Sequence, residues 1–371
     1  MAVLTEEQTI LRDQAVSWVN ADAPVSAFRK LRDSGSITGF APDTWKSICE
    51  MGWTGIVVPE AHGGSDLGYM TFGLLLEELG KQLVASPLYA SGLVGATALR
   101  FAGTDAQKQN CLPAIASGEA IVTLAIDEGP RHAPDAIAMS AEKTGSGYRL
   151  NGTKSFVIEG GSATHLIVAA RSGQDIVLLL VDASATGLSR EVLKTADSRG
   201  YANITFKNVD VAATALMSAG HGKATLDAIL DRARAGIASE MLGAASAAFD
   251  MTLEYLKTRK QFGQLIGSFQ ALGHRAAELY TEMELTRSAV EAALQAIDAG
   301  SKDVPLLCSL SKYKVGAFLF RMSNQLIQIH GGIGMTDEFN AGFYLKRARA
   351  VEALYGGQGF HRDRYARLSG F

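Results

Sequence analysis

The spacing of apolar residues predicts a helical N-terminal region over residues 1–118. In its first stretch the apolar positions recur at roughly helical intervals: Leu4, Ile10, Leu11, Val16 and Val19. A second apolar-faced helix is predicted over residues 70–79, and two more over 88–101 and 105–116. Thr104 or Asp105 could cap the last of these, because both side chains accept hydrogen bonds from free helix N–H groups.

The period changes in residues 119–222. Short runs rich in β-branched and aliphatic residues occupy 120–126, 148–150, 165–170, 176–181 and 202–209. Turn signals such as Asn151-Gly152 separate them. This zone is predicted to form a small antiparallel β domain.

Long helical patterns return in residues 223–371. They cover 226–258, 269–299, 304–330 and 343–353, with glycine-containing links between them. Long antiparallel helices with short links usually form a bundle. The predicted fold class is therefore α+β, with an N-terminal helical domain, a middle β domain and a C-terminal four-helix bundle.

Composition excludes several classes of function. The chain has 35 Lys and Arg against 38 Asp and Glu, a net charge of -3, which gives no electrostatic basis for binding nucleic acid or an anionic membrane. No apolar run reaches the roughly 18 residues that span a bilayer. The N-terminus has no targeting pattern, and the three distant cysteines suggest neither disulfides nor a metal site. We expect a cytoplasmic protein.

Five motifs resemble those of the acyl-CoA dehydrogenase family, in the order in which that family carries them. They are Met51–Gly64, Gly103–Glu119, Asn151–Lys154 followed by Gly160-Gly161, Thr258–Gln270 and Gln328–Gly334. Within the family, the stretch 255–270 and the C-terminus resemble the small subunit of pimeloyl-type acyl-CoA dehydrogenases. The resemblance implies oxidation of an acyl-CoA thioester between Cα and Cβ. Side chains cannot accept a hydride, so a flavin, FAD, must do so.

The resemblance also implies which residues bind FAD. In the C-terminal motifs these are Arg259, Phe262 and Gln270, with Gln328, Gly331 and Gly332, acting across a subunit interface. An arginine suits a pyrophosphate because its planar fork donates two parallel hydrogen bonds. In the middle domain the aromatic flavin contact corresponds to Phe156. The hydroxyl partner of flavin N5 falls on Ile158, whose side chain cannot form that bond. Asp127 and Glu128 are either flavin contacts or a polar strand end.

Coenzyme A is expected at Asp231 and Arg234, which match the family's Asp-x-x-Arg at the start of the long bundle helix. Their spacing places both on one helix face. The alternative is an ordinary surface pair. Arg347 and Arg349 are expected to be solvated.

The catalytic base is missing from both positions that the family uses. The loop that normally carries a glutamate reads Tyr355-Gly356 here, and the alternative position on the long helix is Ala233. Glu240 is the replacement candidate, because it lies two turns beyond Ala233 in an apolar helix where desolvation would raise its pKa. It could instead be a paired structural carboxylate. Glu352 and Asp363 are expected to be surface charges.

Two functional hypotheses remain open. The chain is either an FAD-dependent acyl-CoA dehydrogenase with a displaced base, or a catalytically silent subunit of a mixed tetramer in which a related chain supplies the base. The resemblance implies a tetramer, homomeric or heteromeric, and electron-transfer flavoprotein as electron acceptor. An acyl-CoA oxidase or flavin monooxygenase fits less well, since oxidases of this kind normally carry a further C-terminal domain.

Overall fold

The structure is a computed structural model that describes residues 3–217 and 222–371. The first helices are α1 (Glu6–Ala21), α2 (Val25–Ser34), α3 (Pro42–Glu50), α4 (Gly68–Lys81), α5 (Ala96–Ala102) and α6 (Asp105–Ala116). Short 3-10 turns at Trp53–Gly55 and Glu60–His62 link α3 to α4, and a π-helical segment, η3 (Leu88–Gly95), precedes α5. Helix α6 has the predicted bounds. Thr104 caps it with a capping box, accepting from the N–H of Gln107.

A sheet follows these helices. Its strands are β1 (Val122–Ala125), β2 (Ser140–Lys143), β3 (Gly147–Ile158), β4 (His165–Ser172), β5 (Asp175–Asp182), β6 (Leu188–Leu193) and β7 (Tyr201–Ala212). Within the described residues the strand order is β1-β4-β2-β3-β7-β6, with β5 paired to β4. The prediction of an antiparallel domain was wrong in part, because β4 pairs parallel with both β1 and β2. Buried aliphatic residues, among them Leu150, Leu166, Leu179, Ile204 and Val209, form the core on the sheet.

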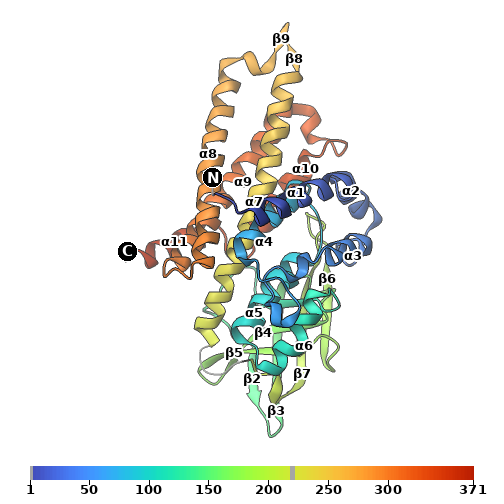
Figure 1. The fold of residues 1–371 in the computed structure, drawn as a ribbon, viewed down its shortest axis with the longest axis vertical. Helices are drawn as coiled ribbons and strands as arrows, with labels where there is room; N and C mark the ends of the chain where they lie inside the picture. The colour runs from blue at the N-terminus through green and yellow to red at the C-terminus, as the bar shows by residue number, and fades with distance from the viewer. Residues whose placement is uncertain (1–2, 218–221) are drawn as a thin grey trace. The chain divides into compact units, whose positions relative to one another are not determined.

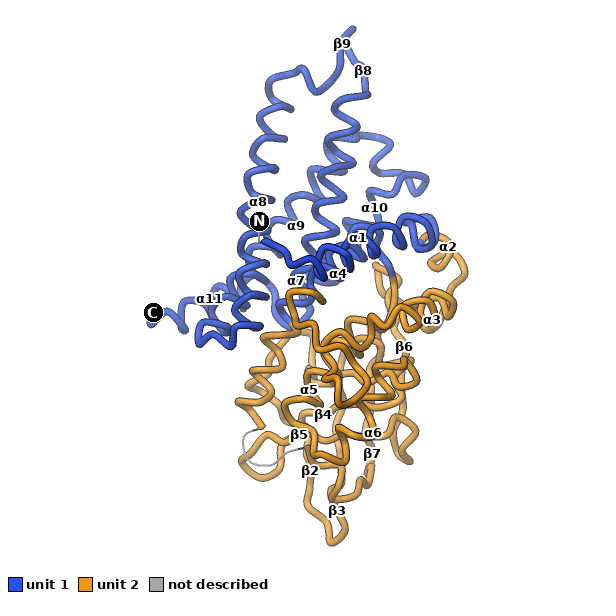
Figure 2. The backbone as a smooth tube through the Cα atoms, viewed as in Figure 1, with its two compact units in different colours: residues 1–28, 73–84, 234–371 blue, residues 29–72, 85–233 orange. Residues whose placement is uncertain are grey.

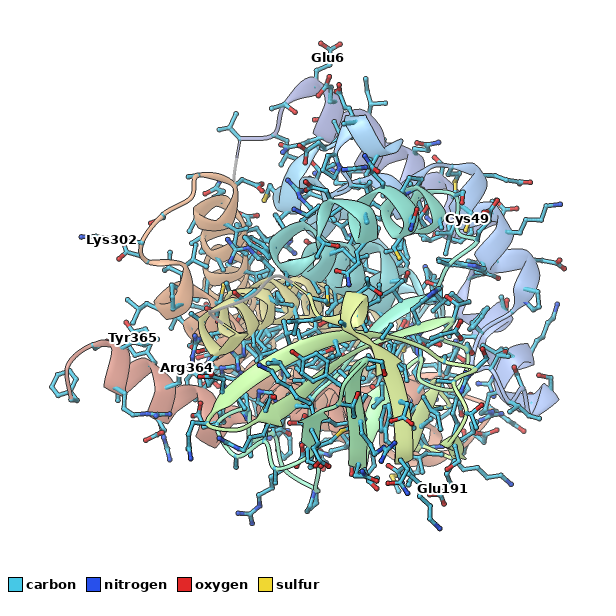
Figure 3. All side chains as sticks on the ribbon, turned by 90° about the horizontal axis from the view of Figure 1, so that it is seen from below. Glu6, Cys49, Glu191, Lys302, Arg364 and Tyr365 are labelled. Atoms are coloured by element: carbon cyan, nitrogen blue, oxygen red, sulfur yellow. The ribbon has the colours of Figure 1, made fainter. Side chains whose placement is uncertain are left out.

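Strands β2 and β6 of this sheet were not predicted, and one predicted turn lies inside a strand. Edge strand β6 exposes four of its six residues, so it lacks an apolar alternation, and Glu191 on it is labelled in Figure 3. The Asn151-Gly152 pair does not end a strand. Strand β3 runs through it, and the register with β7 shifts between Leu150 and Gly152. The glycine accommodates this irregularity with a φ of +146°.

The C-terminal half is helical, as predicted. It contains α7 (Gly222–Thr258), a small hairpin of β8 (Lys260–Gln261) and β9 (Gln264–Leu265), α8 (Gln270–Asp298), α9 (Val304–His330), α10 (Ala341–Ala353) and α11 (Gln358–Leu368). Figure 1 shows α8 beside α7, with the β8–β9 hairpin joining them at one end. Helix α9 has the predicted bounds, and helix α11 was not predicted. The α+β fold class is confirmed.

The described chain divides into two compact units that interleave along the sequence (Figure 2). Unit 1 contains residues 1–28, 73–84 and 234–371, and unit 2 contains residues 29–72 and 85–233. Within unit 1, α4 packs tightly against α7. A Cβ on Gly80 would lie 2.2 Å from the carbonyl oxygen of Glu240, and one on Gly243 would lie 1.9 Å from that of Glu77. Only glycine permits this approach, which fixes where Glu240 lies.

Candidate functional site

A cavity of about 370 Å³ lies beside the β8–β9 hairpin, within unit 1. It brings together three of the predicted cofactor residues, Arg259, Phe262 and Gln328. Phe262 is 92% exposed, an unusual position for a large apolar side chain. The same cavity is lined by Arg275, so two guanidinium-bearing residues border it. Cations beside an open aromatic surface suit a phosphate-bearing ligand that also has a ring system.

The remaining residues of that predicted set are placed differently. Gly331 and Gly332 follow α9 directly, and a Cβ on either would meet nothing within 4 Å, so another backbone or ligand could approach them closely. Gln270 begins α8 and is exposed, but it is not among the residues that line the cavity. Arg259, Phe262 and Gln328 therefore line one cavity, whereas Gln270 does not line it.

His330 borders the same cavity, and its side chain is packed. Its ring stacks on Tyr255 at 4.2 Å between centroids, and Phe339 lies 4.6 Å away. Its Nδ1 lies 2.8 Å from the carbonyl oxygen of Leu326, at hydrogen-bond distance. Burial lowers the pKa of the imidazole, so the ring is neutral at physiological pH.

Phe156 and Ile158 lie at the end of strand β3, within unit 2. Phe156 is 54% exposed with a φ of +52°, and its N–H donates to Asn203 Oδ1 at 3.2 Å. Strain of this kind in a non-glycine residue is typical of functional sites. Ile158 is buried, and its carbonyl oxygen accepts a hydrogen bond from the Thr123 hydroxyl at 2.7 Å. The side chain at position 158 offers a ligand no hydrogen bond.

Glu128 is a structural clamp, which neither sequence interpretation anticipated. Its carboxylate pairs with the buried ammonium of Lys154 at 2.7 Å and accepts the N–H groups of Ala138 and Met139. Lys154 also donates to the carbonyl of Ile126 at 2.9 Å. Neighbouring Asp127 lies 2.9 Å from His132 Nδ1. Both acids therefore hold the segment after β1 in place.

The clamp gives a pH prediction. Burial alone would raise the pKa of Glu128, but the hydrogen bond and charge of Lys154 hold it below its ordinary 4.5. A carboxyl with a lowered pKa stabilises the fold above its unfolded pKa and loses that contribution as pH falls through the folded value. Glu128→Gln should therefore lower the Tm near pH 7, and the difference from wild type should shrink below pH 4.5.

Exposed Glu119 supplies the control for that measurement. Thermal unfolding of Glu119→Gln should match wild type across the same range of pH. A Glu128→Gln deficit that stays constant from pH 7 to pH 4 would show that the carboxylate charge does not stabilise this segment.

The start of the long helix places the predicted coenzyme A residues in the interior. Asp231 is 2% exposed and Arg234 is 1% exposed, so the interpretation as a surface pair was wrong. The Arg234 Nε donates to the carbonyl of Tyr355 at 3.1 Å, and its guanidinium lies over the Phe360 ring. Between them, Ala233 is fully buried and accepts a hydrogen bond from Tyr89 at 2.7 Å.

The setting of Glu240 differs from the apolar one expected. The Nε and Nη2 of Arg347 donate to its Oε1 at 2.9 Å and 2.6 Å. The expectation that Arg347 is solvated was wrong, since only 5% of its side chain is exposed. A buried carboxylate that already accepts two charge-assisted hydrogen bonds from a guanidinium is engaged as a structural partner. This geometry favours the structural interpretation of Glu240 over the catalytic one.

The other two acids lie as follows. Asp363 pairs with Arg367 at 3.0 Å on the surface, as predicted. The Glu352 side chain accepts from Gln358, and its carbonyl oxygen accepts from Lys312.

Lys312 of α9 went unnoticed in the sequence. Its side chain is buried, and Nζ donates to three carbonyl oxygens, those of Val351, Glu352 and Gly356, at 3.0 to 3.3 Å. Burial lowers the pKa of this lysine to about 7. The ammonium thus fastens the end of α10 and the loop after it. A lysine inside an otherwise apolar helix face was the available signal.

A second cavity of about 610 Å³ lies in unit 2, beside the start of α7. Charged residues of both signs line it: Asp135, Lys143, Arg171, Asp175 and Lys223. No sequence motif pointed to it. Among the described residues no group of three His, Cys, Asp or Glu side chains could hold a metal ion, and no helix is long and apolar enough to cross a membrane.

Comparison with known proteins decides the family. The N-terminal domain of acyl-CoA dehydrogenases matches residues 5–119, and the C-terminal domain matches residues 220–369. The "Probable acyl-CoA dehydrogenase YngJ" of Bacillus subtilis (strain 168) is 32% identical over 365 residues, covering 94% of both chains. The chain belongs to the acyl-CoA dehydrogenase family. Its fold is that of the family: a helical N-terminal domain, a middle sheet and a C-terminal helical domain.

Two solved structures resemble the chain over nearly its whole length. A variant of the Tcur3481–Tcur3483 steroid ACAD is 31% identical, with a TM-score of 0.90 and 98% coverage of both chains. The ChsE4–ChsE5 complex of Mycobacterium tuberculosis is 25% identical, with a TM-score of 0.91 and full coverage of both chains. The match to the small subunit of pimeloyl-type enzymes stays a prediction.

Proposed function

We propose that this chain is a subunit of an FAD-dependent acyl-CoA dehydrogenase in which another subunit supplies the catalytic base. The observation that carries the proposal is the ion pair of Glu240 with Arg347. Position 233 holds alanine and positions 355 and 356 hold tyrosine and glycine. Glu240, the replacement candidate, is paired with Arg347 in the core. Removal of the α proton from a thioester needs a free base, which none of these residues provides.

The residues present fit FAD. The cavity lined by Arg259, Gln328 and exposed Phe262 has the charge and aromatic surface that the adenosine diphosphate part needs. Exposed Phe156 offers an aromatic face for the flavin ring. When bound, FAD accepts the hydride that leaves Cβ of the acyl group. The contribution of this chain is to bind and orient the flavin, and Ile158 adds no hydrogen bond to its ring.

Arg234 has a positioning role in this proposal. The resemblance implies that coenzyme A binds at Asp231 and Arg234, while the Arg234 guanidinium donates to the carbonyl of Tyr355. The arginine would thus connect the start of α7 with the loop at 353–357. The second cavity, with Lys143, Arg171 and Lys223, is a candidate for the phosphates of the coenzyme.

A mixed assembly is supported by relatives of the same kind. The solved structures at 31% and 25% identity are named as the Tcur3481-Tcur3483 steroid ACAD and the ChsE4-ChsE5 complex, and each name joins two designations. We therefore propose a heterotetramer, with electron-transfer flavoprotein as acceptor, and steroid-derived acyl-CoA thioesters as the first substrates to test. A homotetramer with a base elsewhere in this chain is the alternative.

Flavin content tests the assembly. The chain should be purified alone and together with the acyl-CoA dehydrogenase chain that copurifies with it from its own host. We expect full flavin occupancy, and reduction of that flavin by an acyl-CoA, only in the mixed particle. A homomeric particle with one flavin per chain that turns over acyl-CoA would refute the mixed assembly.

A further inference from the structure

The loop between α10 and α11, residues 353–357, has an unusual backbone. Tyr355 has a φ of +54° and Gly356 a φ of +111°. The first value is uncommon for a bulky aromatic residue, and the second lies outside the narrow left-handed region that L-residues can adopt. Two consecutive positive values make a tight turn that only glycine permits at position 356.

Three buried contacts hold the loop in this conformation. Lys312 Nζ donates to the carbonyl of Gly356 at 3.3 Å, and Arg234 Nε donates to that of Tyr355 at 3.1 Å. The N–H of Gly356 donates to the carbonyl of Ala353 at 3.1 Å. Side chains from two helices, Lys312 of α9 and Arg234 of α7, therefore fix both carbonyls of the turn, so the strained backbone is specified by its surroundings.

The space beside Gly356 is already filled. A Cβ there would lie 2.5 Å from Phe360 Cδ1 and 2.9 Å from His361 Nε2. Neither neighbour can move easily. His361 is fully buried, and the Phe360 ring is packed under the guanidinium of Arg234, 5.3 Å from its centroid. Even one methyl group would force a rearrangement of this well-packed region.

We infer that this loop excludes every side chain at position 356, so that the chain cannot regain a carboxylate there by a single substitution. Phe360 and His361 of α11 occupy the volume that the side chain would need. The inference rests on the proposed function in one respect, namely that position 356 is one of the two positions, 355 or 356, that correspond to the base of the family. The absence of a glutamate at position 356 is thus tied to the conformation and packing of this loop.

The test compares Gly356→Ala with Gly357→Ala by thermal unfolding of the full chain. Gly357 is a matched control, because its φ is −83° and a Cβ there would meet only the Glu352 carbonyl at 3.9 Å. We expect Gly356→Ala to lower the Tm by several degrees, or to prevent folding, while Gly357→Ala stays close to wild type. Equal Tm values for the two variants would overturn the inference.

A second comparison separates collision from backbone strain. Gly356→Ala should cost fewer degrees in a Phe360→Ala background than in the wild-type chain, because the ring that it strikes is gone. An equal cost in both backgrounds would overturn the assignment of Phe360 to the excluded volume. Thermal unfolding requires neither flavin nor substrate, so this test can fail while the proposed function stands, and the reverse also holds.

Discussion

Arg347→Met should lower the free energy of unfolding by about 3–5 kcal/mol, the usual effect of leaving a buried charge without its partner. The variant keeps the apolar stem of the side chain but removes both donors from Glu240 Oε1. Since 11% of the Glu240 side chain is exposed, water can replace little of what is lost. Denaturant unfolding followed by circular dichroism measures the change.

Arg349→Met is the matched control, two residues further along α10. Arg349 is exposed, lies over the Phe320 ring and donates to Asn324. Its replacement should cost about 1 kcal/mol or less, as is usual for surface contacts of this kind. The double variant Glu240→Leu with Arg347→Met should recover most of the lost stability, because no charge is then left buried.

A substitution of Glu240 distinguishes a structural role of this carboxylate from a catalytic one. In a flavin-loaded assembly whose flavin is reduced by acyl-CoA, Glu240→Gln should leave the rate of flavin reduction nearly unchanged, because this carboxylate has a structural role. A catalytic base would respond differently, with reduction abolished and flavin still bound. That outcome, in a variant whose stability is intact, would return Glu240 to the active site.

Arg259→Ala should weaken flavin binding by about 10- to 100-fold, the range that corresponds to one lost charge-assisted hydrogen bond of about 1.5–3 kcal/mol. Arg259 borders the cavity beside the β8–β9 hairpin and is exposed, so its replacement should not unfold the bundle. Titration of FAD with apoprotein, followed by flavin fluorescence, measures the affinity.

Lys260→Ala is the control for that experiment. Lys260 is the next residue, equally exposed, and does not line the cavity. General loss of positive charge at the hairpin would affect both variants alike. A flavin affinity that is equal in Arg259→Ala and wild type would remove this cavity from the cofactor site.

Elements with a strong local signal could be predicted from the sequence. Helix α9 has an apolar period, Pro305 in its first turn and Gly331 directly after it, and the structure gives it the predicted bounds. Helix α6 carries a capping box at Thr104. Strand β6 and helix α11 were missed because β6 is mostly exposed and α11 buries only His361, so neither shows a clear apolar period.

The environment of the candidate site could not be read from the sequence. Glu240 and Arg347 are 107 positions apart, and no periodicity reports that they meet. Lys312 donates to three carbonyls at the end of α10 and in the loop that follows it. These contacts depend on how α9 and α10 pack. The motifs predict which residues bind flavin, while tertiary packing determines which charged side chains are already paired.

An anaerobic visible spectrum tests whether this chain needs another subunit for its catalytic base. The chain is purified alone and supplied with FAD and a panel of acyl-CoA thioesters that includes steroid-derived ones. We expect that no thioester bleaches the flavin absorbance, and that bleaching by one of them begins when the partner chain is added. Bleaching of the flavin by an acyl-CoA in the homomeric protein would show that this chain supplies its own base, and would contradict the account.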